Sequence, residues 1–213
     1  MTTINRILIV WIVGNAFLFA LGFIFSASHY PIDFDGLNCP KYGNTLLECA
    51  MIGFPFGAVT GIIIGVGQAW LLRKYFSPPP KILVFWALAT VIGFALGHSI
   101  GDSGPIPQFL PYSALIFGTL SGIIVGFLQW LVLRSWTNGA GRWIIFSAIG
   151  FGIGLGLFGV LALVILDEVR NPLPPFIDFV GLLVLATLEG VLVGGFWGIA
   201  TTQVIKRLEP ELV

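Results

Sequence analysis

Residues 57–73 read Gly57-Ala-Val-Thr-Gly61-Ile-Ile-Ile-Gly65-Val-Gly67-Gln68-Ala-Trp70-Leu-Leu-Arg73, and this stretch decides the fold. The pattern returns 61 residues later as Gly118-Thr-Leu-Ser-Gly122-Ile-Ile-Val-Gly126-Phe-Leu-Gln129-Trp-Leu-Val-Leu-Arg134. Glycines spaced four residues apart lie on one stripe of an α-helix, and the glutamine that follows them lies on the same stripe. Inside an apolar segment, such a stripe allows a second backbone to approach closely in a bilayer.

The composition is that of an integral membrane protein. Hydrophobic residues make up 57% of the chain and charged residues 9%, whereas a soluble domain carries about 25% charged residues. Lys and Arg together number 10, as do Asp and Glu, so no net charge points to nucleic acid. We expect residues 1–213 to form a single integral membrane domain whose main partner is the lipid bilayer.

Six apolar runs are long enough to cross a bilayer, which takes about 20 residues in a helix. They lie near 5–25, 48–72, 82–101, 113–133, 143–166 and 179–205. All six are predicted to be helices, because a lipid-exposed strand would leave backbone groups unpaired. The predicted fold is therefore an all-α bundle of six transmembrane helices.

Basic residues divide unevenly between the two ends of this bundle. Only Lys41 and Arg170 fall at one end, while the other end has Arg6, Arg73, Lys74, Lys81, Arg134, Arg142, Lys206 and Arg207. Because short cytoplasmic loops carry an excess of Lys and Arg, we expect both termini in the cytoplasm. Tryptophans near the basic ends of the spans are predicted to be interfacial anchors: Trp70, Trp86, Trp130 and Trp143.

The glycine stripes also define an internal repeat. Three copies occur, the last of them degraded: Gly57, Gly61 and Gly65; Gly118, Gly122 and Gly126; and Gly190, Gly194 and Gly198. The odd-numbered spans repeat too, since Trp11, Trp86 and Trp143 are each followed eleven residues later by glycine. We expect three parallel helical hairpins, at roughly 1–75, 76–135 and 136–207, related by a pseudo-threefold axis along the membrane normal.

We expect the glycine stripes, a glycine zipper in each even-numbered span, to pack those spans tightly against one another around this axis. The alternative is that the glycines make room for a flat ligand or a narrow passage.

Gln68 and Gln129 lie on the glycine stripes, roughly 7–8 Å inside the basic end of their spans. An unpaired amide at that depth is costly, so a partner is expected. Interhelical hydrogen bonding is one explanation. The other is a polar ring with Thr201, Thr202 or Gln203, which would line the mouth of a solute pathway or hold a headgroup.

Glu189 lies seventeen residues before Lys206, and His98 lies seventeen residues after Lys81, so both are roughly 25 Å from the basic end. An intramembrane acid is by default a candidate functional residue. A Glu189–His98 pair, with Asp102 one turn further out, would form a proton-titratable cluster. The alternative is a protonated or hydrogen-bonded carboxyl that fixes the helix register.

One His and one Glu do not make a metal site, and no His-Glu-x-x-His or Gly-x-Ser-x-Gly motif points to an enzyme.

Cys39 and Cys49 are the only cysteines. The topology puts both on or near the non-cytoplasmic face, where disulfides form. Either they close a short loop as a disulfide, or they are two free thiols with Cys49 buried in the second span.

The repeated segment resembles a family of uncharacterised bacterial multi-pass membrane proteins that is frequent in cyanobacteria. The shared pattern is Gly-x-x-x-Gly-x-x-x-Gly-x-x-Gln-Trp-Leu-x-Leu-Arg, followed by a turn and Trp-x6-Gly-x3-Gly. Gly118 to Arg134, followed by Trp143 to Gly154, matches it most clearly, and the match fades in the first and sixth spans. The resemblance implies a bacterial inner (plasma) membrane or a thylakoid membrane, and it implies no activity.

Short loops and the lack of a nucleotide-binding motif favour a non-catalytic scaffold or accessory subunit, with other membrane-protein subunits as partners. In a photosynthetic membrane, Gln68, Gln129 or His98 would be candidate ligands of a pigment. No residue pattern identifies a cofactor, and a bound lipid or pigment is compatible with the sequence.

The alternative function is a small solute or ion transporter, or a membrane substrate-binding subunit, with a pathway along the glycine-lined central helices. An intramembrane enzyme would require His98 and Glu189 to bond each other or share a cavity.

Overall fold

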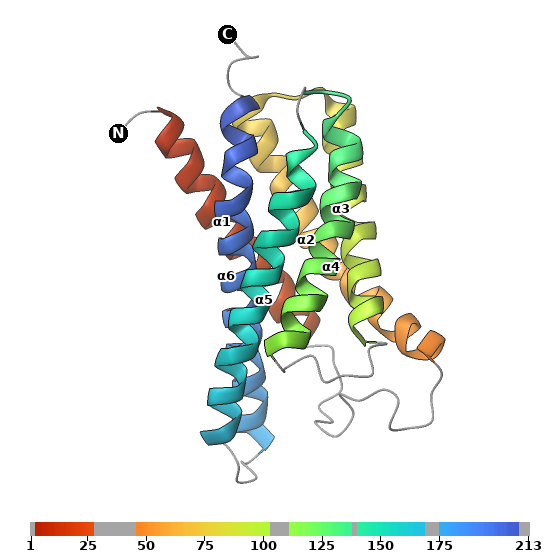
Figure 1. The fold of residues 1–213 in the computed structure, drawn as a ribbon, viewed down its shortest axis with the longest axis vertical. Coiled ribbons are helices and arrows are strands. Elements are labelled where there is room, and N and C mark those ends of the chain that lie inside the picture. The colour runs from red at the N-terminus through yellow and green to blue at the C-terminus, as the bar shows by residue number, and fades with distance from the viewer. Residues whose placement is uncertain (1–2, 28–45, 103–110, 138–139, 169–174, 209–213) are drawn as a thin grey trace.

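The computed structural model describes residues 3–27, 46–102, 111–137, 140–168 and 175–208 of the 213-residue chain. The described residues form six α-helices (Figure 1): α1 (Thr3–Ala27), α2 (Leu46–Phe76), α3 (Pro80–Asp102), α4 (Pro111–Leu133), α5 (Arg142–Glu168) and α6 (Pro175–Leu208). Each contains a segment long and apolar enough to cross a membrane. For the described residues, the prediction of an all-helical protein with six such segments is confirmed, and the architecture is that of a multi-pass membrane protein.

Proline opens three of the helices: α3 begins at Pro80, α4 at Pro111 and α6 at Pro175. Proline suits the first helical position, because the backbone N–H that it lacks has no partner there and its φ is already near the helical value. Ser77, just after α2, has a φ of 46°. This left-handed conformation is common where a helix ends, and it turns the chain towards α3.

The helices form a closed ring in chain order. Extensive contacts join each helix to the next one along the chain and join α6 to α1. The largest interfaces are those of α2 with α3, α4 with α5, and α6 with α1. Within the described residues, contacts between any two of α2, α4 and α6 are marginal at most. Six crossings bring the start of α1 and the end of α6 to the same end of the bundle (Figure 1).

The glycine stripes meet the backbone of a neighbouring helix. A Cβ atom on Gly122 in α4, for example, would lie 2.5 Å from the Ser147 carbonyl oxygen and 2.8 Å from Ala148 Cα, both in α5. The stripe of α2 meets α3 in the same way, and the stripe of α6 meets α1. The glycines concerned are Gly57, Gly61, Gly65, Gly118, Gly122, Gly126, Gly190, Gly194 and Gly198.

The expectation that these stripes pack α2, α4 and α6 against one another is therefore wrong. Small residues at four-residue spacing indicate that some backbone approaches closely, but they do not say which one. The neighbouring backbone also occupies the space along each stripe, so the stripes do not line a passage.

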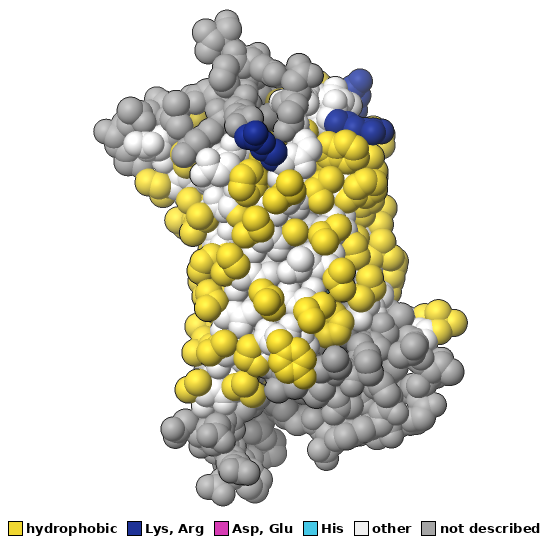
Figure 2. Space-filling model, viewed as in Figure 1, with side chains coloured by type: hydrophobic (Ala, Val, Ile, Leu, Met, Phe, Trp, Pro, Cys, Tyr) yellow, Lys and Arg dark blue, Asp and Glu magenta, His cyan; other side chains and the backbone are white. Residues whose placement is uncertain are grey.

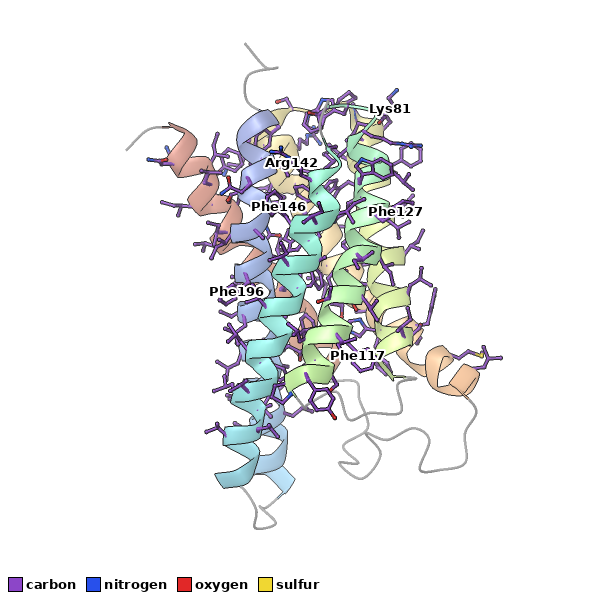
Figure 3. The ribbon with its side chains drawn as sticks, viewed as in Figure 1. Lys81, Phe117, Phe127, Arg142, Phe146 and Phe196 are labelled. Carbon is purple, nitrogen blue, oxygen red and sulfur yellow. The ribbon has the colours of Figure 1, made fainter. Side chains whose placement is uncertain are left out.

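Hydrophobic side chains face outwards around the middle of the bundle. Val13, Phe17, Ile62 and Val66 are examples of large apolar side chains that are exposed. Figure 2 shows such side chains over the mid-section of one face, with Lys and Arg gathered at one end. Lys81 and Arg142 lie at the end where α1 starts and α6 finishes (Figure 3). An apolar girdle with charges beyond it is the surface that a bilayer requires.

Candidate functional site

Large indole rings from α1, α3 and α5 fill the middle of the ring of helices. Trp86 and Trp143 are 0% exposed and Trp11 is 2% exposed. Trp143 packs edge-on against the other two, with ring centroids 5.3 Å from Trp86 and 6.3 Å from Trp11. The interpretation of Trp86 and Trp143 as interfacial anchors is therefore wrong. Trp70, which is 57% exposed, has the surface position that an anchor needs.

Each of these three indole N–H groups donates a hydrogen bond to an even-numbered helix. The acceptors hold equivalent places in the three glycine-stripe segments, eleven residues after the first glycine. The bonds, with their N···O distances, are Trp86 Nε1 to Gln68 Oε1 (3.1 Å), Trp143 Nε1 to Gln129 Oε1 (2.9 Å) and Trp11 Nε1 to Thr201 Oγ1 (3.0 Å).

The amide groups of Gln68 and Gln129 extend this network. Gln68 Nε2 donates to Asn15 Oδ1 at 2.8 Å. Gln129 Nε2 donates to Thr90 Oγ1 at 2.9 Å and to Gln68 Oε1 at 3.3 Å. No buried side-chain nitrogen or oxygen among the described residues lacks a hydrogen-bond partner. Both glutamines are thus interhelical hydrogen-bonding residues, and Thr201 bonds Trp11 and its own helix without joining a polar ring with them.

The polar partners that α1, α3 and α5 contribute were not predicted from the sequence. Asn15, Thr90 and Ser147 are buried, and each lies four residues, or about one helical turn, after Trp11, Trp86 or Trp143. Ser147 Oγ accepts a hydrogen bond from Trp197 Nε1 at 3.1 Å. The sequence pattern that could have identified them is a polar residue four positions after the tryptophan in each of the three repeats. We call this set of hydrogen-bonded side chains the central network. It comprises Trp11, Asn15, Gln68, Trp86, Thr90, Gln129, Trp143, Ser147, Trp197 and Thr201.

Three phenylalanines close the central network on the side away from the basic end. Phe19, Phe94 and Phe151 come from α1, α3 and α5 and lie eight residues after the three tryptophans. Their ring centroids are 5.5, 5.6 and 5.7 Å apart, so the three rings form a nearly equilateral triangle. All three are buried. Aromatic side chains therefore fill the centre at this level as well.

Beyond the phenylalanine triangle, the bundle holds a partly open cavity of about 80 Å³. Glu189 from α6, His98 from α3 and Ser121 from α4 line it, and we call it the Glu189 cavity. Phe117, also on its wall, lies on α4 far from the end that carries Lys81 (Figure 3). The aromatic part of the wall comprises Phe23, Phe94, Phe117 and Phe151.

The polar groups of the Glu189 cavity differ in their bonding. His98 Nδ1 lies 3.1 Å from the Phe94 carbonyl oxygen. Because a carbonyl oxygen only accepts, Nδ1 carries the proton of this bond and Nε2 has the lone pair in the neutral ring. Within the described part of the chain, the Glu189 carboxylate and the Ser121 hydroxyl make no hydrogen bond or ion pair.

The remaining predicted site residues lie elsewhere. Gln203 is exposed on α6, and the Thr202 hydroxyl donates to the Ile199 carbonyl of its own helix. Asp102 is the last residue of α3, and its side chain is outside the described set. Cys39 and the side chain of Cys49 also lie outside the described residues, and with them the expected disulfide.

At the basic end of the bundle, cationic groups lie over tryptophan rings. Lys74 Nζ is 4.9 Å from the centroid of Trp70, and Arg134 Cζ is 5.0 Å from the centroid of Trp130. Such pairs are typical of side chains at the level of lipid headgroups. Trp130, which Arg134 covers, therefore fits the expectation of an interfacial anchor.

The site thus has two parts, a filled and hydrogen-bonded central network and the Glu189 cavity beyond it. Comparison of the chain with protein-family models, with curated proteins and with solved structures found no match.

Proposed function

We propose that this protein is a non-catalytic scaffold or accessory subunit of a larger membrane complex. The central network is the observation that carries the proposal. Indole and phenyl rings fill the middle of the bundle, and every described buried polar side-chain atom has a hydrogen-bond partner. A centre filled in this way favours a rigid body over a pore, because opening it would break several interhelical hydrogen bonds at once.

The proposed body has three repeats related by a pseudo-threefold axis along the membrane normal. Two sets of equivalent contacts support this: the three indole bonds to the even-numbered helices and the triangle of Phe19, Phe94 and Phe151. The three largest interfaces are equivalent too, because each joins an even-numbered helix to the odd-numbered helix that follows it in the ring.

We also propose that both termini are cytoplasmic, in a bacterial inner membrane or a thylakoid membrane. The basic end carries Lys81 and Arg142 and is the end where α1 starts and α6 finishes. This distribution is the one that the positive-inside rule associates with the cytoplasmic side.

Purification from native membranes tests the scaffold role. The chain would carry an affinity tag, be expressed at its native level and be extracted in a mild detergent. Light scattering would then measure the mass of the purified particle. A subunit is expected to elute with other chains in fixed stoichiometry, and deleting it should lower the abundance of that complex. An unrelated multi-pass protein with the same tag is the control. A homogeneous particle made of this chain alone, in two different detergents, would contradict the proposal.

A second candidate function, transport of a small solute, is favoured by the Glu189 cavity. An intramembrane carboxylate beside a cavity is a frequent element of ion pathways. Transport by alternating access requires the cavity to be reached from both sides of the membrane. In a cysteine-free background, Ser121→Cys should then react with impermeant maleimide applied from either side, while Ser147→Cys in the central network should stay unlabelled. Reaction from only one side would count against transport.

A further inference from the structure

We infer that the Glu189 cavity binds a small ammonium-type cation, the ammonium ion or a short alkylammonium. The inference does not depend on the scaffold role, because a subunit of a complex and a carrier working alone would both keep the site.

The Glu189 carboxyl is the one acidic group among the described residues that line the cavity. Glu189 is partly buried, and the described residues around the cavity include no Lys or Arg. A carboxylate inside a bilayer is costly unless a proton or an opposite charge neutralises it. A bound cation would supply that charge. His98 is the other titratable residue among the described lining residues, and its Nδ1 already bonds Phe94.

The chemistry of the wall selects the kind of cation. Four phenyl rings line the cavity, and aromatic faces attract ammonium groups. Among the described lining side chains, the oxygen acceptors are few: the Glu189 carboxylate and the Ser121 hydroxyl. Calcium needs six to eight oxygen ligands, and no group of three or more His, Cys, Asp or Glu forms among the described residues. An ammonium group needs only a few acceptors for its N–H bonds.

The volume of the cavity limits the size of the ligand. It is about 80 Å³, whereas pockets for drug-sized ligands are roughly 300–1,000 Å³. We therefore expect ammonium or methylammonium to fit and tetraalkylammonium ions to be excluded.

The sequence repeat shows that this cavity departs from a common apolar pattern. The residue before the first stripe glycine is phenylalanine in two copies and Glu189 in the third. The residue twelve places after the repeat tryptophan is Phe23 or Leu155 in two copies and His98 in the other. Both exceptions are ionisable, they come from different repeats, and they line one cavity. Packing alone gives no reason for the two exceptions to coincide.

Binding of radiolabelled methylammonium to the protein in lipid nanodiscs tests the inference. Wild-type protein should bind it saturably, and excess ammonium should displace it, whereas excess sodium or potassium should not. Glu189→Gln keeps the shape of the side chain and removes its charge, and it should weaken binding at least tenfold. Absence of saturable binding, equal displacement by sodium, or full affinity in Glu189→Gln would overturn the inference.

A matched pair of variants on α4 tests the aromatic wall. Phe117→Leu removes one ring from the cavity and should weaken methylammonium binding by about threefold to tenfold. Phe127→Leu makes the same change two to three turns along the helix, at a side chain that is 44% exposed on the outer surface, and should leave the affinity unchanged. Equal effects of the two changes would contradict a cation–ring contact.

A measurement on the unaltered protein covers the case in which Glu189→Gln does not fold. A hydrophobic carbodiimide should modify the Glu189 carboxyl, and peptide mass spectrometry would quantify the product. Methylammonium should slow this modification, and sodium at the same concentration should not. Modification at the same rate with and without methylammonium would overturn the inference.

Discussion

Two adjacent glycines in α6 give a matched test of how the ring closes. A Cβ atom on Gly194 would lie 2.5 Å from the Asn15 carbonyl oxygen and 2.8 Å from Phe19 Cβ, both in α1. A Cβ atom on Gly195 would have no atom of another helix within 4 Å. Both variants, Gly194→Ala and Gly195→Ala, add one methyl group to the same helix, so only the position of α1 distinguishes them.

The size of the difference follows from these distances. Ordinary contact begins at 3.4 Å, so at Gly194 α1 would have to withdraw by about 0.9 Å along the line to the Asn15 carbonyl. Forcing an extra methylene into a packed interior typically costs about 1–3 kcal/mol. Withdrawal would also shift Asn15, whose Oδ1 accepts a hydrogen bond from Gln68 Nε2. At Gly195 alanine should be neutral or stabilise the helix by up to about 1 kcal/mol.

Unfolding in mixed micelles with increasing sodium dodecyl sulfate measures these free energies. The buried indoles of the central network provide a fluorescence signal that reports loss of tertiary packing. We expect the free energy of unfolding of Gly194→Ala to fall at least about 1 kcal/mol below that of Gly195→Ala. Equal values for the two variants would refute the reasoning, because they would mean that α1 and α6 are not in backbone contact at this point.

Three further predictions concern the core and the orientation of the bundle. Gln129→Leu should destabilise the fold by about 1–3 kcal/mol, because it leaves the Trp143 N–H without an acceptor. A double-mutant cycle with Trp143→Phe should give a coupling energy of about 0.6–1.7 kcal/mol, and a coupling near zero would contradict the bond. Phe151→Ala should cost about 3–5 kcal/mol of unfolding free energy by opening a void in the phenylalanine triangle, and a loss below 1 kcal/mol would mean that the centre collapses around it. In a cysteine-free background, Gly141→Cys should react with impermeant thiol reagents only from the cytoplasmic side and Tyr112→Cys only from the opposite side; the reverse pattern would invert the proposed topology.

The number of helices and their approximate limits could be predicted from the sequence, because a helix needs about 20 apolar residues to cross a bilayer. Helix α4, for instance, was expected over 113–133 and runs from Pro111 to Leu133. The glycine stripes were also visible as sites of close backbone approach. Their partners were not, since Gly194 meets Asn15, which lies far away in the sequence. Local spacing identifies a surface that packs closely but contains no information about the helix that covers it.

The positions of the core tryptophans could not be predicted from local sequence either. Trp86 and Trp143 were expected at the membrane interface because tryptophan is common there, yet both lie inside, where the indole N–H must find an acceptor. That acceptor is a glutamine on another helix, so the pairing depended on tertiary structure. Distances along the helices, by contrast, were enough to assign His98 and Glu189 to one depth, and both line one cavity.

The interface between α6 and α1 has a consequence for synthesis. The first helix has its larger interface with the last one, and its contact with α2 is smaller. During translation α1 therefore enters the bilayer long before the surface that will cover it has been made. That side of α1 must remain exposed to lipid until α6 has left the ribosome and can pack against it. A chain truncated before α6 would lose that helix and also the larger of the two interfaces that hold α1 in place.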